Sequence, residues 1–206
     1  MRTPDRDRRG FALAALCTAL VAALLVQHGA ALHAEYRVLP NGTAYNASVD
    51  VAGAQKFEFF ETGMLGERIP QKVSNIEVTG NCSPCLFNMS GASSITFSKG
   101  NYTIRYTAPL RDFHLVAAFE QPYSINISLP VEFDVRNPLL AGMNPGAVII
   151  PESDNSTTVQ WNRTMSVDLR FYDQNRETLL YLFGNFWIII AVVLLLPFMI
   201  TVRRKQ

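Results

Sequence analysis

Apolar and polar residues alternate in short runs between positions 35 and 178, and glycine, proline and asparagine separate the runs. In "AYNASVDV", Tyr45, Ala47 and Val49 share one face of an extended chain, and Asn46 lies on the other. Alternation also marks "SINISL", "KFEFF", "SNIEVTG", "SSITFSKGNYTIRYTA", "FHLVAAF", "VEFDV", "AVII" and "TTVQWNRTMSVDLRFY". We therefore predict a mainly β domain, an antiparallel β-sandwich of roughly eight to ten short strands.

The last alternating run predicts a hairpin that turns at Asn162. In this hairpin Trp161 and Met165 face the core, and Tyr172 faces out. A second hairpin turn is predicted at Asn101, in "SKGNY".

An uncharged run of 24 residues extends from Leu179 to Val202. As a helix it would rise ~36 Å, enough to span the ~30 Å hydrocarbon core of a bilayer. Asp173 is a suitable N-cap, so we expect the helix to begin near Gln174, directly after the last strand. Residues 203–206 form a short basic tail, which stays in the cytoplasm. We predict one C-terminal transmembrane α-helix that holds the β domain close to the membrane.

The N-terminal segment "MRTPDRDRRG" is rich in arginine and precedes an uncharged run from Phe11 to Val26. That run would rise only ~24 Å as a helix, which is short for a membrane span and typical of a secretory signal. We predict a signal peptide over residues 1–34, cleaved after Ala34. The domain at 35–178 is then outside, the C-terminus is cytoplasmic, and the protein is a single-pass protein of the plasma membrane.

Residues 35–178 carry eleven lysines and arginines against fifteen aspartates and glutamates, a formal charge of −4. Nucleic acid is not expected as a partner, since phosphate binding needs a basic surface. The expected partners are the lipid bilayer, through the C-terminal helix, and another envelope or membrane protein.

Eight of the twelve asparagines in residues 35–178 begin an Asn-x-Ser/Thr sequon, where chance placement would give about two. This excess predicts N-glycosylation of an external domain. Asn81 is a doubtful acceptor, because Pro84 follows its sequon directly. The other candidate acceptors are Asn41, Asn46, Asn88, Asn101, Asn126, Asn155 and Asn162.

Two cysteines, Cys82 and Cys85, remain once the leader with Cys17 is removed. We interpret them as a local disulfide, worth about 2 kcal/mol by loop entropy. Their Cys-x-Pro-Cys spacing also fits a thiol redox site, but a poor helix-forming sequence follows, whereas redox sites normally seat the first cysteine at a helix N-terminus. Free or intermolecular cysteines are a third interpretation. We predict no metal site, because a structural zinc needs four ligands and the other soft candidate is His114.

His114 lies in "RDFHLVAAFE", on the opposite strand face from Phe113 and Leu115. We interpret it as a half-exposed histidine, since nothing in the sequence singles out a nucleophile or an orienting carboxylate for it. Phosphate-loop, zinc-protease and serine-hydrolase motifs do not occur in the domain sequence. We therefore predict that the protein is not an enzyme and has no catalytic residues, metal or cofactor.

The segment "RNPLLAGMNPGAVII" contains two Asn-Pro steps around Leu139, Leu140 and Met143. A proline favours extended or turn geometry in the residue before it, which predicts an irregular crossover. If the three apolar side chains tuck beneath the sandwich, the loop is structural. If they are exposed, they form a docking loop for a partner or for the bilayer surface.

A leader, a sequon-rich β domain, the "RNPLLAGMNPGA" crossover, a final hairpin and a C-terminal span together resemble an uncharacterised family of euryarchaeal single-span surface proteins. The resemblance covers most of the external domain and the span. It implies an archaeal envelope and brings no known activity, so it assigns no catalytic residues.

These features predict a membrane-anchored surface glycoprotein that is a non-enzymatic binding or structural component of the envelope. One alternative is an extracytoplasmic thiol oxidoreductase or enzyme accessory that uses Cys82 and Cys85. Another is a single-span sensor, or a subunit of a membrane complex, whose span pairs with a multi-pass partner.

Overall fold

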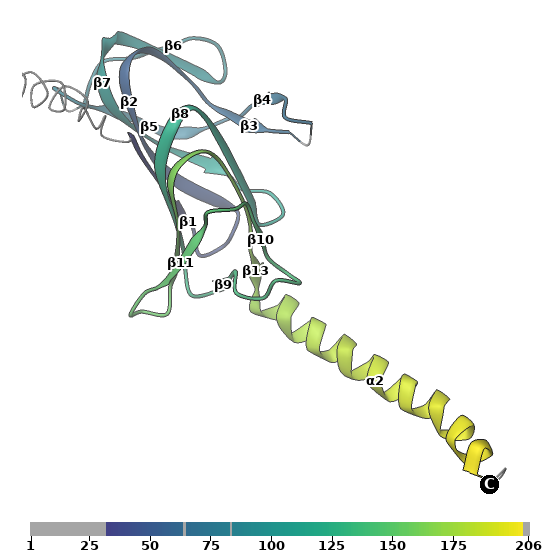
Figure 1. Cartoon of the computed structure of the whole chain (residues 1–206). Coiled ribbons are helices and arrows are strands. Elements are labelled where there is room, and N and C mark those ends of the chain that lie inside the picture. The colour runs from purple at the N-terminus through teal and green to yellow at the C-terminus, as the bar shows by residue number, and fades with distance from the viewer. Residues whose placement is uncertain (1–31, 64, 83, 204–206) are drawn as a thin grey trace, which may run out of the picture. The chain divides into compact units, whose positions relative to one another are not determined.

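The computed structural model describes residues 32–63, 65–82 and 84–203. Figure 1 shows a β domain followed by the helix α2 (Gln174–Arg203). The predicted mainly β fold with a C-terminal apolar helix is confirmed. The predicted signal peptide lies outside the described residues, apart from positions 32–34. In chain order the strands are β1 (Leu32–Val38), β2 (Ala44–Glu58), β3 (Phe60–Thr62), β4 (Arg68–Pro70), β5 (Ser74–Thr79), β6 (Asn88–Met89), β7 (Ser94–Pro109), β8 (His114–Leu129), β9 (Phe133–Asp134), β10 (Gly142–Met143), β11 (Val148–Pro151), β12 (Thr157–Arg170) and β13 (Tyr172–Asp173).

One large sheet joins nine of the described strands in the order β10-β12-β8-β1-β2-β7-β5, with β11 on β12 and β6 on β7. Its pairings are antiparallel except that of β1 with β8, which is parallel. A parallel pair needs a long connection, and here the chain from β2 to β7 supplies it. The small ribbons β3–β4 and β9–β13 lie outside this sheet. The predicted sandwich is therefore built from one mixed sheet and two ribbons.

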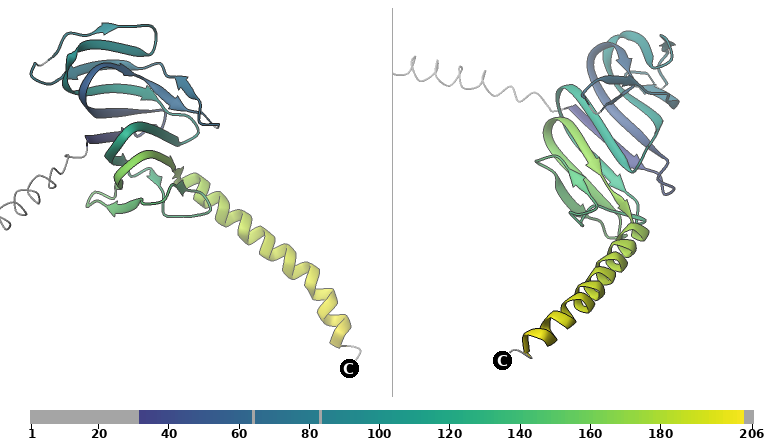
Figure 2. Two further views of the ribbon diagram at one scale, coloured as in Figure 1. Left: turned by 45° about the horizontal axis from the view of Figure 1, so that its top comes forward. Right: turned by 90° about the vertical axis from the view of Figure 1, so that its right-hand side faces the viewer.

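Four strands of the sheet are long, with 15 residues in β2, 16 in β7, 16 in β8 and 14 in β12. Their ladders shift register between Val51 and Ala54 and between Trp161 and Thr164. Such bulges bend a strand without ending it, and Figure 2 shows the long strands curving. The hairpin turns predicted at Asn101 and Asn162 are therefore wrong, because β7 and β12 continue through them.

Alternate side chains of the main strands form the buried face of the sheet. Two predicted orientations are wrong. Met165 is about half exposed because it lies within a register shift of β12, and Tyr172 is buried because β13 pairs with β9 and not with the main sheet. The inward face predicted for β2 is confirmed. The core includes Ala34, Tyr36, Tyr45, Val49, Ile104, Ile127, Val159 and Trp161.

The segment around β3 and β4 covers part of this buried face. The ring of Phe59 packs 4.9 Å from that of Tyr106 in β7. The Tyr45 hydroxyl donates to Gln71 Oε1 at 3.2 Å, and Gln71 Nε2 donates to the Pro109 carbonyl at 3.3 Å. These buried polar groups are thereby satisfied.

An aromatic cluster closes the core where the chain approaches α2. The ring centroids of Phe113, Phe133 and Phe171 lie 5.2 to 5.8 Å apart. Gly42, in the β1–β2 turn, has a φ of +65°, and a Cβ there would lie 2.6 Å from the Phe133 ring. Glycine is therefore required at this turn, both for its backbone conformation and for the close approach of the ring.

Candidate functional site

Short strand pairings gather beside the start of α2 (Figure 1). β10 pairs with the end of β12, where Gly142 lies opposite Arg170. β13 then pairs with β9, and α2 begins at the next residue. We call residues 136–147 the crossover loop. Because β9 precedes this loop and β10 lies within it, backbone pairing holds the loop beside the strand that leads into the helix.

Asn137, the first asparagine of the two Asn-Pro steps, organises the tip of the crossover loop. Its backbone N–H donates to the Tyr172 hydroxyl oxygen at 3.1 Å. Its Oδ1 accepts from the Leu139 N–H at 3.1 Å, and its carbonyl accepts from the N–H groups of Leu140 and Ala141 at 3.1 and 2.9 Å. The tip is therefore a hydrogen-bonded turn attached to the chain just before α2.

Asn144, the second such asparagine, holds the far end of the loop to β12. Its Nδ2 donates to the Ser166 carbonyl at 2.9 Å, and its Oδ1 accepts from the Asp168 N–H at 3.2 Å. Its carbonyl accepts from Trp161 Nε1 at 3.4 Å. The two Asn-Pro steps drew attention to the loop in the sequence, but they did not predict that both asparagines anchor it through hydrogen bonds.

The three apolar residues predicted to form a docking loop have different surroundings. Leu139 is 80% exposed. Leu140 is half-buried and faces the first turns of α2, while Met143 packs against the core. Met143 is therefore structural, Leu139 is exposed as the docking interpretation requires, and docking itself remains a prediction.

The start of α2 agrees with the sequence prediction. Asp173 Oδ1 accepts from the Arg176 N–H at 2.9 Å, which makes Asp173 the N-cap, and the helix begins at Gln174. The Arg176 guanidinium lies over the ring of Phe113, 4.8 Å from its centroid. This cation–π contact links the first turn of the helix to the aromatic cluster of the β domain.

A shallow apolar groove of about 660 Å³ runs between Leu140 and α2. Arg176 is the charged residue in its lining, which also contains Leu179, Leu180, Leu182, Phe183 and Phe186. No sequence pattern pointed to this groove, because it forms between segments that are distant along the chain.

The arginine of the crossover loop, Arg136, is bound to Asp134. Arg136 Nε lies 2.9 Å from both carboxylate oxygens, and the backbone N–H of Val135 also donates to Asp134. Burial raises the pKa of Asp134, but these hydrogen bonds outweigh it and hold the pKa below its usual value. The charge of Arg136 is thus largely neutralised by Asp134 of β9.

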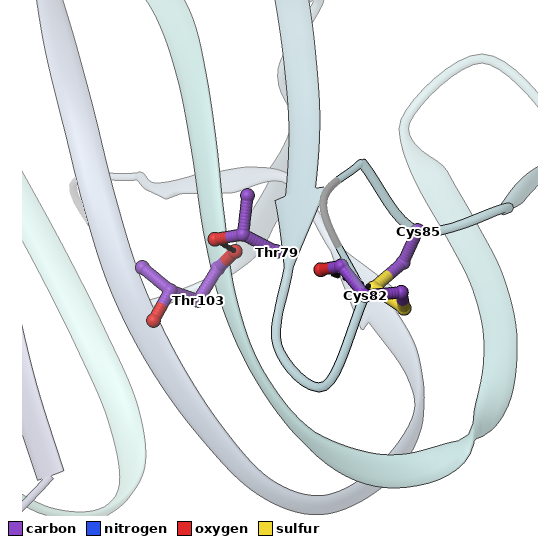
Figure 3. Close-up of a disulfide and its surroundings, with 4 residues drawn as sticks. All are labelled: Thr79, Cys82, Cys85 and Thr103. Atoms are coloured by element: carbon purple, nitrogen blue, oxygen red, sulfur yellow. Dashed lines mark hydrogen bonds between the residues drawn. A yellow bond between two sulfur atoms is a disulfide. The ribbon is translucent and has the colours of Figure 1, made fainter.

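Figure 3 shows Cys82 and Cys85 at disulfide-bonding distance, with their Cα atoms 5.1 Å apart. Cys85 is buried, and its N–H donates to the Val78 carbonyl at 2.7 Å. This hydrogen bond attaches the cysteine turn to the end of β5. The neighbouring Thr79 hydroxyl donates to the Thr103 carbonyl at 3.3 Å. The next described element is β6, so neither cysteine has the helix N-terminus that lowers a thiol pKa in redox sites.

His114 is half-buried, and its Nε2 lies 2.7 Å from Asp168 Oδ1 on β12. Both residues line an open cleft of about 390 Å³, together with Glu61 and Arg111. The described residues contain no group of three histidine, cysteine, aspartate or glutamate side chains placed to hold a metal. The sequence did not reveal Asp168 as a partner, because strand pairing alone brings it to His114.

Seven of the eight sequon asparagines are exposed, and Asn126 is half-buried. Four of them use the amide oxygen as a hydrogen-bond acceptor, and in the described part of the chain their amide nitrogen, the atom that would carry a sugar, donates no hydrogen bond. These four are Asn41, Asn46, Asn101 and Asn162. Glycosylation itself remains a prediction.

A mainly β domain that continues without a linker into one helix long and apolar enough to cross a membrane defines the class of this protein. The chain belongs to a family of unknown function, DUF5803, whose model matches residues 88–206. The matched part includes the crossover loop and α2. No curated protein matches the chain. Membership of an uncharacterised family is thus confirmed, and a euryarchaeal origin remains a prediction.

Proposed function

We propose that this protein is a single-pass surface glycoprotein whose β domain is held directly against the outside of the plasma membrane. There it acts as a non-enzymatic binding or structural component of the envelope. The observation that carries this proposal is the direct passage from β13 into the apolar helix α2. With no linker between them, the base of the β domain must lie at the membrane surface if α2 spans the bilayer.

The exposed apolar surface of α2 supports membrane anchoring. Its side chains at Trp187, Ile188 and Leu194 are all more than half exposed. Apolar surface left in water costs about 25 cal/mol per Å², so a helix of this composition is stable only when an apolar medium covers it. A bilayer supplies that medium along the whole helix.

The positions of the sequons suggest that the polar face of the sheet is glycosylated and that the crossover loop is left for contacts. Asn46 and Asn126 lie on the polar face of the sheet, opposite the core, and Asn162 Oδ1 accepts from the Ser124 hydroxyl of the neighbouring β8. Glycans on these residues would cover that face and keep protein partners away from it. The crossover loop contains no sequon. Its exposed residues therefore remain free for contacts at the membrane.

Extraction and protease accessibility of the full chain in its own membranes test the proposal. We expect the protein to resist alkaline carbonate, to lose its β domain to external protease in intact cells, and to shift in mass after deglycosylation. A matched chain that ends at residue 178 should be released as a soluble domain. Release of the full chain by carbonate, or protection of its β domain from external protease, would contradict the proposal.

The pairing of β1 refines where a leader would be removed. Leu32 and His33 pair with β8, and Ala34 is fully buried, so cleavage after Ala34 would take three residues from β1. Cleavage after Ala31 would keep every described residue of β1, and Gly29 and Ala31 supply the small residues that signal peptidase prefers. We propose Leu32 as the mature N-terminus. N-terminal sequencing of the purified protein distinguishes it from Glu35.

A further inference from the structure

We propose that the tip of the crossover loop enters the outer leaflet of the membrane, and that the groove between Leu140 and α2 holds a phospholipid. The acyl chain would occupy the apolar groove, and the lipid phosphate would pair with Arg176. This inference rests on the membrane anchoring proposed above, and it names a phosphate-bearing lipid as the ligand of the same site.

The spacing of residues on α2 matches such a ligand. Arg176, Leu179, Leu180 and Phe183 follow the i, i+3, i+4, i+7 pattern that places side chains on one helix face. All four line the shallow groove, and Leu140 borders it on the side of the crossover loop. From Arg176 to Phe183 the helix rises ~10 Å. The guanidinium therefore lies at the end of the apolar stripe nearest the β domain, and the stripe is long enough to contact one segment of an acyl chain.

The depth of the crossover loop relative to the membrane follows from the residues of α2 that it faces. Leu140 lines the groove with Leu179, the first residue of the uncharged run. Leu139 is adjacent in the chain, within ~4 Å at the Cα atoms, and is 80% exposed. The hydrogen bonds of Asn137 hold both leucines in one turn. A membrane that surrounds the uncharged run therefore meets the exposed leucine at its outer boundary.

The charges at this site favour a phosphate at Arg176. Arg136 is occupied by Asp134, whereas Arg176 forms no ion pair with a carboxylate among the described residues. Stacking on Phe113 holds one face of the Arg176 guanidinium and leaves its N–H edge available for bidentate pairing. Glu177 is next in sequence, but it projects about 100° away around the helix axis.

Lipid fits this groove better than a protein segment does, because the groove is continuous with the surface of the spanning helix. Nearly all of its lining belongs to α2 residues within or beside the uncharged run. In a bilayer these residues already contact lipid, so a lipid chain enters the groove without displacing another protein.

Tryptophan quenching in vesicles tests the position of the loop. The full chain carries Leu139→Trp together with Trp187→Phe, and it is reconstituted into phosphatidylcholine and phosphatidylglycerol vesicles with brominated acyl chains. We expect emission at position 139 to fall roughly twofold or more, since an inserted apolar side chain reaches the acyl boundary. Native Trp161 is buried and serves as an internal reference.

Leu86→Trp in the same Trp187→Phe background is the matched control. Leu86 is 97% exposed and lies beside the disulfide, in the segment that leads to β6. We expect brominated lipid to leave its emission unchanged. An unquenched tryptophan at 139, whether in water or beneath a protein partner, would overturn the inference.

A second experiment tests Arg176 by native mass spectrometry of the full chain released from micelles with added phosphatidylglycerol. We expect Arg176→Gln to weaken retention of the lipid roughly tenfold, since a charge-assisted hydrogen bond is lost. Arg170→Gln, which removes an exposed arginine of β12, should leave retention unchanged. Equal retention by both variants would overturn the assignment of Arg176.

The two proposals fail in different ways. Extraction of the reconstituted chain by carbonate would overturn membrane anchoring, and with it the lipid site. A chain that stays embedded while the tryptophan at 139 is unquenched would overturn the insertion of the loop. Equal lipid retention by Arg176→Gln and Arg170→Gln would overturn the lipid site, and in both cases membrane anchoring would stand.

Discussion

The two tryptophans of this chain lie in two regions that differ in how far their apolar side chains are buried. Trp161 in β12 is 1% exposed, and Trp187 in α2 is 54% exposed. Both regions are rich in large apolar side chains, but the β domain covers its own with other strands, whereas α2 does not. The contrast indicates that the β domain buries its own apolar side chains away from water, whereas α2 needs an apolar environment from outside the chain.

The largest expected effect comes from truncating the two tryptophans. Trp161→Ala should lower the free energy of unfolding of the β domain by about 3 to 5 kcal/mol, because it removes a buried side chain and leaves a cavity. Trp187→Ala should change that free energy by less than about 0.5 kcal/mol. Denaturant unfolding of both variants in the same micelles measures the difference. Similar losses in the two variants would show that α2 packs against the domain.

A charge in the middle of α2 should act on membrane insertion and leave the fold intact. Leu194→Arg is expected to cost about 2.5 to 3.5 kcal/mol on insertion and to move most of the protein out of the carbonate-resistant fraction. Leu194→Phe, an apolar replacement, is the control. If Leu194→Arg is embedded as well as the control, α2 does not span a bilayer as an isolated helix.

Alkaline pH should weaken the β domain through its buried tyrosines. Burial raises the pKa of Tyr45 to about 12. The folded state then holds its proton more tightly than the unfolded state, so this contribution is complete below pH 10 and is lost as the pH rises toward 12. The loss should reach about 2 to 3 kcal/mol.

Unfolding by denaturant at several pH values measures this loss. Tyr45→Phe should be less stable near neutral pH, since the contact with Gln71 is gone, and it should lose less stability between pH 10 and 12. An unchanged pH slope in this variant would show that other groups control the alkaline transition.

The smallest effect is expected at Asp173, where the two regions join. Asp173→Ala removes the acceptor of the Arg176 N–H and should cost about 1 kcal/mol. Asp173→Asn keeps an N-cap and should cost only a few tenths of that. Thermal unfolding of both variants compares them. Equal costs would mean that charge, and not capping, matters at this junction.

Local patterns were sufficient where geometry depends on neighbours in the sequence. The alternation in β2 predicted that Tyr45 is buried and Asn46 exposed, because successive side chains of any strand point to opposite faces. The capping chemistry of Asp173 predicted the start of α2 for a similar reason. Alternation failed at Asn101 and Asn162, since a bulge interrupts the pattern as a turn does.

The candidate site was predicted only in part. The two Asn-Pro steps identified the crossover loop, but its apolar residues could not be sorted into buried and exposed ones. That division depends on the pairing of β9 and β10 with segments near the C-terminal end of the domain. The contact of Arg176 with Phe113 likewise joins residues that no local pattern connects.

The sequence by itself determined the composition of each region: alternating runs that must form strands, and one uncharged run that needs an apolar environment. These properties depend on residues a few positions apart, so they survive without knowledge of the fold. Only the tertiary structure decided that β1 runs parallel to β8, that β7 and β12 bend without turning back, and that Leu140 faces α2. Those outcomes depend on hydrogen bonds and packing between segments that are distant in the sequence. No pattern among neighbouring residues indicates which of these segments will pair.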